Sequence, residues 1–115
     1  MAARARLLDD VFAALADPTR RAIVERLLAS GELSVGDVAK SFEISAPAIT
    51  RHLQVLERAG LIERRSERQW RYVRVRKEAL SPVEGWLSRQ RRYWTGALDR
   101  LEALAAAQTA RRRKS

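Results

Sequence analysis

The sequence predicts a mainly helical fold that carries one small β-hairpin, an α+β fold. Over most of the 115 residues, apolar side chains recur every three or four positions, which is the period of a helix. Over residues 61–75 the period changes to two, which is typical of strands. Because 46% of the residues are hydrophobic, we expect a single folded domain over residues 1–109, followed by a basic disordered tail over residues 110–115.

Capping residues mark the first two predicted helices. Residues 5–16 place apolar side chains on one face of a helix, namely Leu7, Leu8, Val11, Phe12 and Leu15. Asp17 then caps a second helix, in which Pro18 takes the first position. We expect this helix to end at about residue 29, because Ser30 and Gly31 follow.

Residues 33–60 predict two short helices joined by a tight turn. Ser34 caps the first helix and Ser45 caps the second, with Pro47 in its first turn. Residues 43–45 are too few for anything but a turn, and we expect Ile44 to fill the core beneath it. The residues expected to face inward from the second helix are Ile49, Leu53 and Leu56.

The opposite face of this second helix begins with small and hydrogen-bonding side chains. These are Ala46, Thr50, Arg51 and Gln54, and the capping residue Ser45 directly precedes them. Such a helix start suits the major groove of DNA, where Thr50, Arg51 and Gln54 would reach base edges. Ser45 and Ala46 would approach the DNA backbone or a thymine methyl group. A helix-turn-helix also occurs as a packing unit without DNA, so the motif alone leaves both interpretations open.

A predicted hairpin directly follows Gly60, with strands at residues 61–65 and 70–75, and this order defines a winged helix-turn-helix. Six arginines decorate the hairpin: Arg64, Arg65, Arg68, Arg71, Arg74 and Arg76. We expect Arg65 and Arg68 to contact DNA phosphates, and Arg74 and Arg76 to have a structural or solvent role. The alternative is that these arginines form the solvated outer face of a thin sheet.

The last predicted helix opens at residues 81–84 with a capping box and carries a wide apolar stripe. From Val83 to Leu104, the spacings alternate between four and three, which is a heptad seam. Since little of the domain remains to cover the stripe, we expect a second copy of the chain to do so, with the first helix beside it. The predicted dimer-interface residues are Leu8, Phe12, Val83, Leu87, Trp94, Leu101 and Leu104. The alternative is a clamp over the chain's own core.

Composition narrows the class of partner. The net charge of +9 points to a polyanion. The chain has no cysteine, and its one histidine, His52, cannot build a metal site alone; we interpret His52 as a half-buried packing or hydrogen-bonding residue. No apolar run approaches the ~20 residues that span a membrane, and Asp9 and Asp10 lie where a signal peptide would be apolar. We therefore expect a cytoplasmic protein with no membrane association, no metal and no cofactor.

The order of elements and three stretches of sequence resemble the ArsR/SmtB-type winged-helix repressors. The stretches, within residues 5–105, are LADPTRRAIVERL, LSVGDVAKSFEISAPAITRHLQVLERAGLIERR and WRYVRV. The resemblance implies a homodimer that binds operator DNA as a transcriptional repressor. Where metal-sensing members often carry cysteines, this chain has Ser34 and Gly36, so the resemblance does not extend to metal sensing. The glycine usual near the wing tip is also missing, and Arg68-Gln69 stands there instead.

The sequence therefore predicts a dimeric, sequence-specific DNA-binding transcriptional regulator and repressor. It would bind an imperfect palindromic operator on double-stranded DNA with the helix at 45–59 and the wing at 61–76. An RNA-binding or architectural nucleic-acid-binding module is the alternative, but it leaves the seam and the polar helix start unexplained. We expect no enzyme, because the chain lacks a nucleophile–base pair, a Gly-rich phosphate loop and a suitably spaced carboxylate pair.

Overall fold

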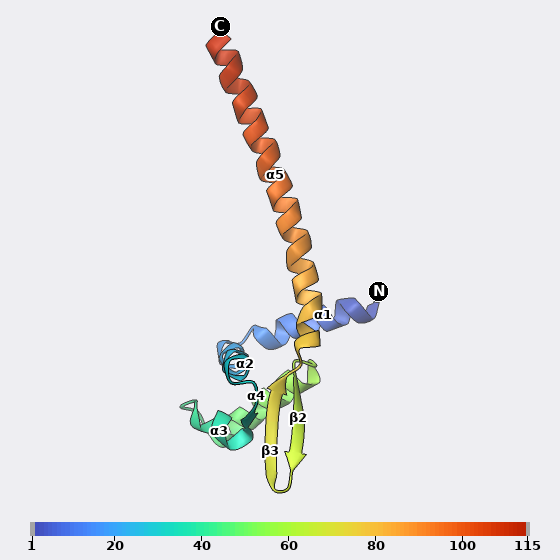
Figure 1. Ribbon diagram of the computed structural model, residues 1–115, viewed down its shortest axis with the longest axis vertical. Coiled ribbons are helices and arrows are strands. Elements are labelled where there is room, and N and C mark those ends of the chain that lie inside the picture. The colour runs from blue at the N-terminus through green and yellow to red at the C-terminus, as the bar shows by residue number, and fades with distance from the viewer. Residues whose placement is uncertain (1, 115) are drawn as a thin grey trace. The chain divides into compact units, whose positions relative to one another are not determined.

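The computed structural model describes the backbone of residues 2–114 and the side chains of residues 7–113, and it divides after Val83 into two units. The elements of the first unit are α1 (Ala2–Leu15), α2 (Pro18–Ser30), β1 (Leu33–Ser34), α3 (Val35–Lys40), α4 (Ala46–Arg58), β2 (Ile62–Glu67), β3 (Trp70–Val75) and the 3-10 helix η1 (Lys77–Leu80) (Figure 1). The last helix, α5 (Ser81–Lys114), begins in the first unit, and its part after Val83 forms the second unit. The single domain expected over residues 1–109 stays a prediction.

Caps define the ends of α1 and α2. The Asp17 carboxylate accepts a hydrogen bond from the backbone N–H of Arg20 at 2.9 Å, and Gly31 ends α2 with a φ of +84°. Both predicted boundaries of α2 are confirmed. The carboxyl end of α1 is capped by side chains that the sequence analysis did not consider: Arg20 donates to the Ala14 carbonyl oxygen at 2.6 Å, and Arg21 to that of Leu15 at 2.7 Å.

The helix-turn-helix has the predicted caps. The Ser34 hydroxyl oxygen accepts from the backbone N–H of Asp37 at 3.1 Å, and Ser45 accepts from that of Ala48 at 3.3 Å. The expectation that Ile44 fills the core is wrong, because its side chain is 39% exposed. Phe42, two residues earlier, packs against the core from the same turn, and Ile44 lies outside it.

The chain leaves α4 through a Schellman motif. The backbone N–H of Leu61 donates to the Leu56 carbonyl oxygen, and that of Gly60 donates to the Glu57 carbonyl oxygen, both at 3.0 Å. Gly60 has a φ of +78°, a conformation that other residues rarely adopt. Leu56 and Leu61 are fully buried, so the end of α4 and the start of the hairpin are joined within the core.

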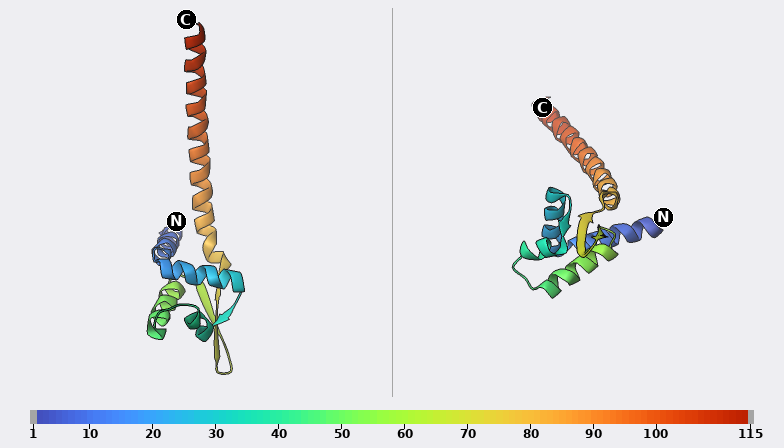
Figure 2. Two further views of the ribbon diagram at one scale, coloured as in Figure 1. Left: turned by 90° about the vertical axis from the view of Figure 1, so that its left-hand side faces the viewer. Right: turned by 60° about the horizontal axis from the view of Figure 1, so that its bottom comes forward.

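The sheet is antiparallel, with the strand order β1-β3-β2. The β2–β3 hairpin confirms the predicted wing, but β2 is longer than expected and the turn is only Arg68-Gln69. The end of the hairpin extends beyond α3 and α4 (Figures 1 and 2). β1 was not predicted, because a two-residue strand has no alternation to detect. It pairs Leu33 with Val73 and Ser34 with Tyr72.

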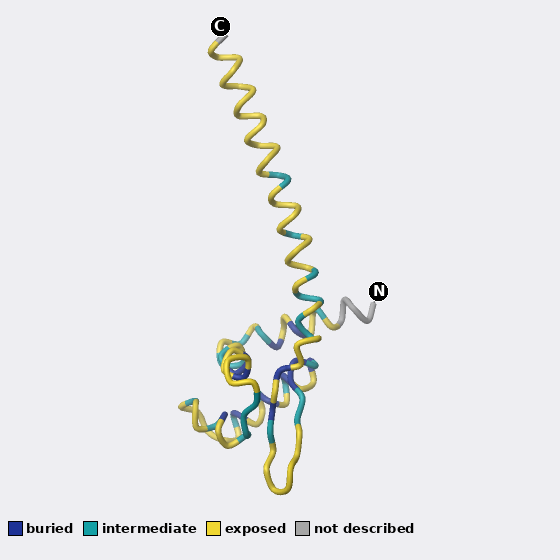
Figure 3. Tube along the Cα trace, viewed as in Figure 1, coloured by how far each residue is buried: buried dark blue, intermediate teal, exposed yellow. Residues whose placement is uncertain are grey.

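One core holds the helices and the base of the hairpin together (Figure 3). Its largest fully buried side chains are Val11, Ile23, Leu27, Val38, Ile49, Leu53, Leu56, Leu61, Ile62 and Val73. The inward face predicted for α4 is therefore confirmed. Each buried side chain of this size stabilises the fold by roughly 1.5–3 kcal/mol relative to an exposed one.

α5 is a continuous helix of 34 residues. α5 begins at Ser81, where the last helix was predicted to open, but Ser81 has helical dihedral angles and directly continues η1, so it does not adopt the extended conformation of an N-cap. The helix also includes residues 110–114, which were expected to be a disordered tail. No glycine or proline follows Gly96, and alanine and arginine, which favour helices, are frequent beyond it. Most of its large apolar side chains are exposed: Trp86, Leu87, Tyr93, Trp94, Leu98, Leu101 and Leu104.

The cap at Asp17 predicts an acid-sensitive contribution to stability. The hydrogen bond from Arg20 holds the pKa of the Asp17 carboxyl below its ordinary value of 3.8. Its stabilisation is therefore complete above that pH and is lost as the pH falls through the lower folded-state pKa. Asp17→Ala should lower the Tm at pH 7, and the difference from the wild type should narrow below pH 3.8.

Thermal unfolding followed by circular dichroism over a pH series measures this effect. Asp17→Asn is the control, because asparagine keeps a capping oxygen without the titrating charge. Equal Tm values for the wild type and Asp17→Ala at pH 7 would contradict the prediction.

Candidate nucleic-acid interface

The outward face of α4 gathers the five residues that the sequence analysis selected there. Ser45, which caps α4, and Ala46, Thr50, Arg51 and Gln54 within it are all exposed, whereas Ile49, Leu53 and Leu56 form the buried side of the helix. The face is polar without being acidic, so it can approach a polyanion. The structure thus brings this part of the predicted site together on one surface.

Two side chains on this face have defined hydrogen-bonding capacity. The Thr50 hydroxyl donates to the Ala46 carbonyl oxygen at 3.1 Å, so its oxygen remains free to accept. Among the described side chains, no carboxylate lies in ion-pair distance of Arg51. Its planar group of donors is therefore available for a bidentate contact, the geometry that suits guanine.

The strand register of the hairpin divides its side chains between two faces. Ile62, Arg64, Val73 and Val75 share the face that packs on the core, and Ser66 and Arg71 continue this face toward the turn. The outer face carries three cross-strand pairs, which are Glu63 with Arg74, Arg65 with Tyr72, and Glu67 with Trp70.

The guanidinium of Arg65 contacts two carboxylates and an aromatic ring on the outer face. Its guanidinium donates to Glu32 Oε1 at 2.6 Å and to Glu67 Oε2 at 2.8 Å, and its Cζ lies 4.6 Å from the centre of the Tyr72 ring. The hydrogen bond with Glu32 raises the pKa of Arg65 above its ordinary value and lowers the pKa of Glu32. The predicted phosphate contact of Arg65 stays a prediction, and these two carboxylates weigh against it.

Arg68 and Arg71 are the exposed cations at the end of the wing. Neither has an ion pair among the described side chains. Arg68 has a φ of +58°, so this arginine adopts the turn conformation that favours glycine. Trp70 beside them is 55% exposed. Arg71 and Trp70 were not among the predicted DNA contacts, and the two-residue turn places both of them close to the tip of the wing.

The other arginines of the hairpin pair within the fold. Arg74 Nε lies 2.6 Å from Glu63, Arg76 Nε lies 3.8 Å from the same carboxylate, and Arg64 Nε lies 3.0 Å from Glu57 of α4. These contacts agree with the structural role expected for Arg74 and Arg76.

His52 is half-buried, with its Nδ1 atom 4.0 Å from the Asp17 carboxylate, which agrees with the packing role expected for it. Among the described side chains, no group of three or more His, Cys, Asp or Glu residues is placed to hold a metal ion. The expected independence from metals stays a prediction. Over the same described part of the chain, no helix has the length and apolarity of a membrane span.

A polar recognition helix followed by a cationic hairpin defines a winged helix-turn-helix DNA-binding domain. Comparisons with known proteins agree. A helix-turn-helix domain family model matches residues 15–65. The transcriptional repressor SdpR of Bacillus subtilis is 36% identical over 80 residues, which cover 70% of this chain and 88% of that protein.

Solved structures identify the family. The crystal structure of an ArsR family transcriptional regulator superposes with a TM-score of 0.70 and 37% identity, covering 77% of this chain and 91% of that one. A homodimeric winged helix-turn-helix DNA-binding domain from Mycobacterium bovis, a possible ArsR-family regulator, superposes with a TM-score of 0.63 and 26% identity, covering 80% and 86%. The chain belongs to the ArsR family of transcriptional regulators.

The contacts of Arg65 predict the titration of Glu32. Its pKa lies below the ordinary value of 4.5, chiefly because Arg65 donates to the carboxylate, so the pair contributes stability above that pH and loses it as the pH falls. Arg65→Ala should return the pKa of Glu32 toward 4.5, as measured by an NMR titration of its side-chain carboxyl. Arg74→Ala, which removes a weaker Coulombic influence, should shift it less. An unchanged pKa in Arg65→Ala would show that the pair does not form in solution.

Proposed function

We propose that the protein is a dimeric, sequence-specific DNA-binding transcriptional repressor of the cytoplasm that uses no metal or cofactor. The observation that carries the proposal is the polar outward face of α4 next to a hairpin with two unpaired cations at its end. The net charge of +9 supports a polyanionic partner. The repressor role is supported by SdpR, which is a transcriptional repressor.

Each part of the interface has a role that fits its chemistry. Thr50, Arg51 and Gln54 read base edges in the major groove, where side chains of this kind discriminate between base pairs. Ser45 and Ala46 approach the DNA backbone or a thymine methyl group. Arg68 and Arg71, both at the end of the wing, contact phosphates. Such contacts fix the orientation of the protein without reading the base sequence.

The second copy of the chain covers the apolar seam of α5. Trp94, Leu101 and Leu104 are each 62% exposed, and aromatic and aliphatic side chains of this size favour burial. The other proposed interface residues of α5 are Val83 and Leu87, and Leu8 and Phe12 lie in α1. The homodimeric relative from Mycobacterium bovis supports this assembly. Two copies of α4 would then enter successive major grooves about 34–36 Å apart, so the operator should be an imperfect palindrome.

Base reading and phosphate contact should respond differently to mutation. Arg51→Ala should lower operator affinity by roughly 1–3 kcal/mol per contact and relax the preference at one base step in each half-site. Arg68→Gly should weaken operator and scrambled duplexes alike and reduce the salt slope by about one per contact. The same change should not lower the Tm, because glycine adopts the φ of +58° without strain.

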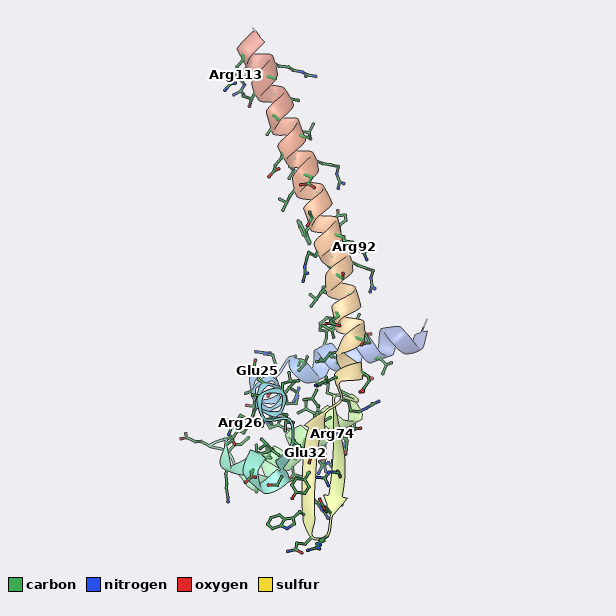
Figure 4. All side chains as sticks on the ribbon, in the orientation of Figure 1. Glu25, Arg26, Glu32, Arg74, Arg92 and Arg113 are labelled. Carbon is green, nitrogen blue, oxygen red and sulfur yellow. The ribbon has the colours of Figure 1, made fainter. Side chains whose placement is uncertain are left out.

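The measurement is binding to a duplex selected from a random library, and to its scrambled form, over a salt series. Arg26→Ala is the control, because it removes the same charge from the exposed face of α2 (Figure 4). Competition with single-stranded RNA separates duplex binding from RNA binding. If Arg51→Ala weakens both duplexes equally and Arg68→Gly loses only the operator, the two roles are reversed.

The seam of α5 predicts a dimer that charge can separate. Trp94→Glu together with Leu101→Glu would bury carboxylates in the seam, so the double variant should sediment as a monomer while the wild type sediments as a dimer at micromolar concentration. Amide NMR signals of residues 11–75 show whether the first unit stays folded. Thr95→Glu, which places a carboxylate outside the seam, should remain dimeric. A monomeric wild type would contradict the proposal.

A further inference from the structure

The end of the wing lies beyond the core. Val73 and Ile62 are the last fully buried residues of the two strands, whereas residues 65–71 are exposed throughout. A two-stranded hairpin without a hydrophobic face is only marginally stable in water. The segment that carries Arg68 and Arg71 therefore needs contacts other than core packing to keep one orientation.

Arg65 supplies such a contact across the full width of the sheet. It belongs to β2, an edge strand, while Glu32 directly precedes β1, the opposite edge. The guanidinium passes over Tyr72 of the central strand and binds Glu32 at both ends of the carboxylate, with Nη2 at 2.6 Å and Nε at 3.3 Å. Planar bidentate pairs of this kind fix direction as well as distance.

Arg65 also binds the acidic residue nearest the turn. Nη1 donates to Glu67, whose carboxylate would otherwise stand unpaired beside Arg68. One cation thus faces two carboxylates, so Arg65, Glu32 and Glu67 together carry one net negative charge. A phosphate beside Arg65 would meet these two carboxylates, whereas Arg68 and Arg71 form no ion pair among the described side chains.

We propose that Arg65 is a positioning residue that braces the end of the wing against Glu32, so that Arg68 and Arg71 are held ready for DNA. The inference rests on the proposed DNA-binding function. Holding a binding loop in one orientation strengthens binding because less conformational freedom is lost on association. The brace therefore acts on affinity without itself contacting the phosphates.

Glu32→Gln tests the brace, because the loss of a negative charge and the loss of the brace should change DNA affinity in opposite directions. The change removes a negative charge and by Coulomb attraction alone would tighten DNA binding. If the brace positions the wing, Glu32→Gln instead weakens binding to operator and scrambled duplexes, by roughly two- to fivefold. Glu63→Gln is the matched control, since it removes the same charge from the same sheet face, where Glu63 pairs with Arg74 at 2.6 Å near the base of the hairpin. It should bind as tightly as the wild type or more tightly.

Exchanging the two partners gives a rescue test. Arg65→Glu alone should weaken binding, and combining it with Glu32→Arg should recover a large part of the loss if the pair acts as a brace. A direct phosphate contact from position 65 would not be recovered, because a carboxylate there repels DNA.

Amide hydrogen exchange of the free protein measures, without DNA, whether the brace stabilises the end of the wing. The amides of residues 65–72 should exchange faster in Glu32→Gln and in Arg65→Ala than in the wild type or Glu63→Gln. Unchanged exchange, or tighter DNA binding by Glu32→Gln, overturns the brace. If the wild type binds no DNA while the exchange rates change as expected, the proposed function fails and the brace stands.

Discussion

The interface depends on one constraint, which is that α4 and the base of the wing share a single core. Leu56 and Leu61 are buried together on either side of the Schellman turn at Gly60, and Ile62 and Val73 extend the same core into the sheet. Because interiors of this kind are closely packed, the helix cannot rotate without moving the hairpin. Packing therefore sets the position of the base of the wing relative to α4, whereas the end of the wing, which carries Arg68 and Arg71, lies beyond the core.

Most of the fold could be predicted because its signals are local. Asp17, Ser34 and Ser45 cap helices within three residues, and Gly60 ends α4 where the period of the apolar residues changes. The errors lie where distant parts of the chain decide the outcome. Ile44 is exposed since Phe42 packs on the core, and β1 exists only because β3 pairs with it. The exposure of Thr50, Arg51 and Gln54 follows from the same helical period and could also be predicted, whereas their role in reading DNA stays a prediction.

The ion pairs of the wing could not be predicted, since they join residues far apart in the sequence. Arg65 and Glu32 are 33 positions apart, and no local pattern connects them. Of the six arginines counted in the hairpin, Arg64, Arg65, Arg74 and Arg76 have carboxylate partners. The number of arginines in the hairpin therefore overstates how many cations a polyanion would meet there, and side-chain placement is needed to find those that are unpaired.

The hydrogen bond within α4 from Thr50 to Ala46 limits what this threonine can recognise. Its hydroxyl hydrogen is already used at 3.1 Å, so toward a base it offers only an oxygen lone pair and a methyl group. In the major groove, the amino groups of adenine and cytosine can donate to such an oxygen, and the methyl group of thymine can pack against its carbon. Guanine presents two acceptors there and finds no donor in Thr50. If Thr50 faces a base as we propose, this single hydrogen bond inside the helix restricts its favourable contacts to adenine, cytosine and thymine.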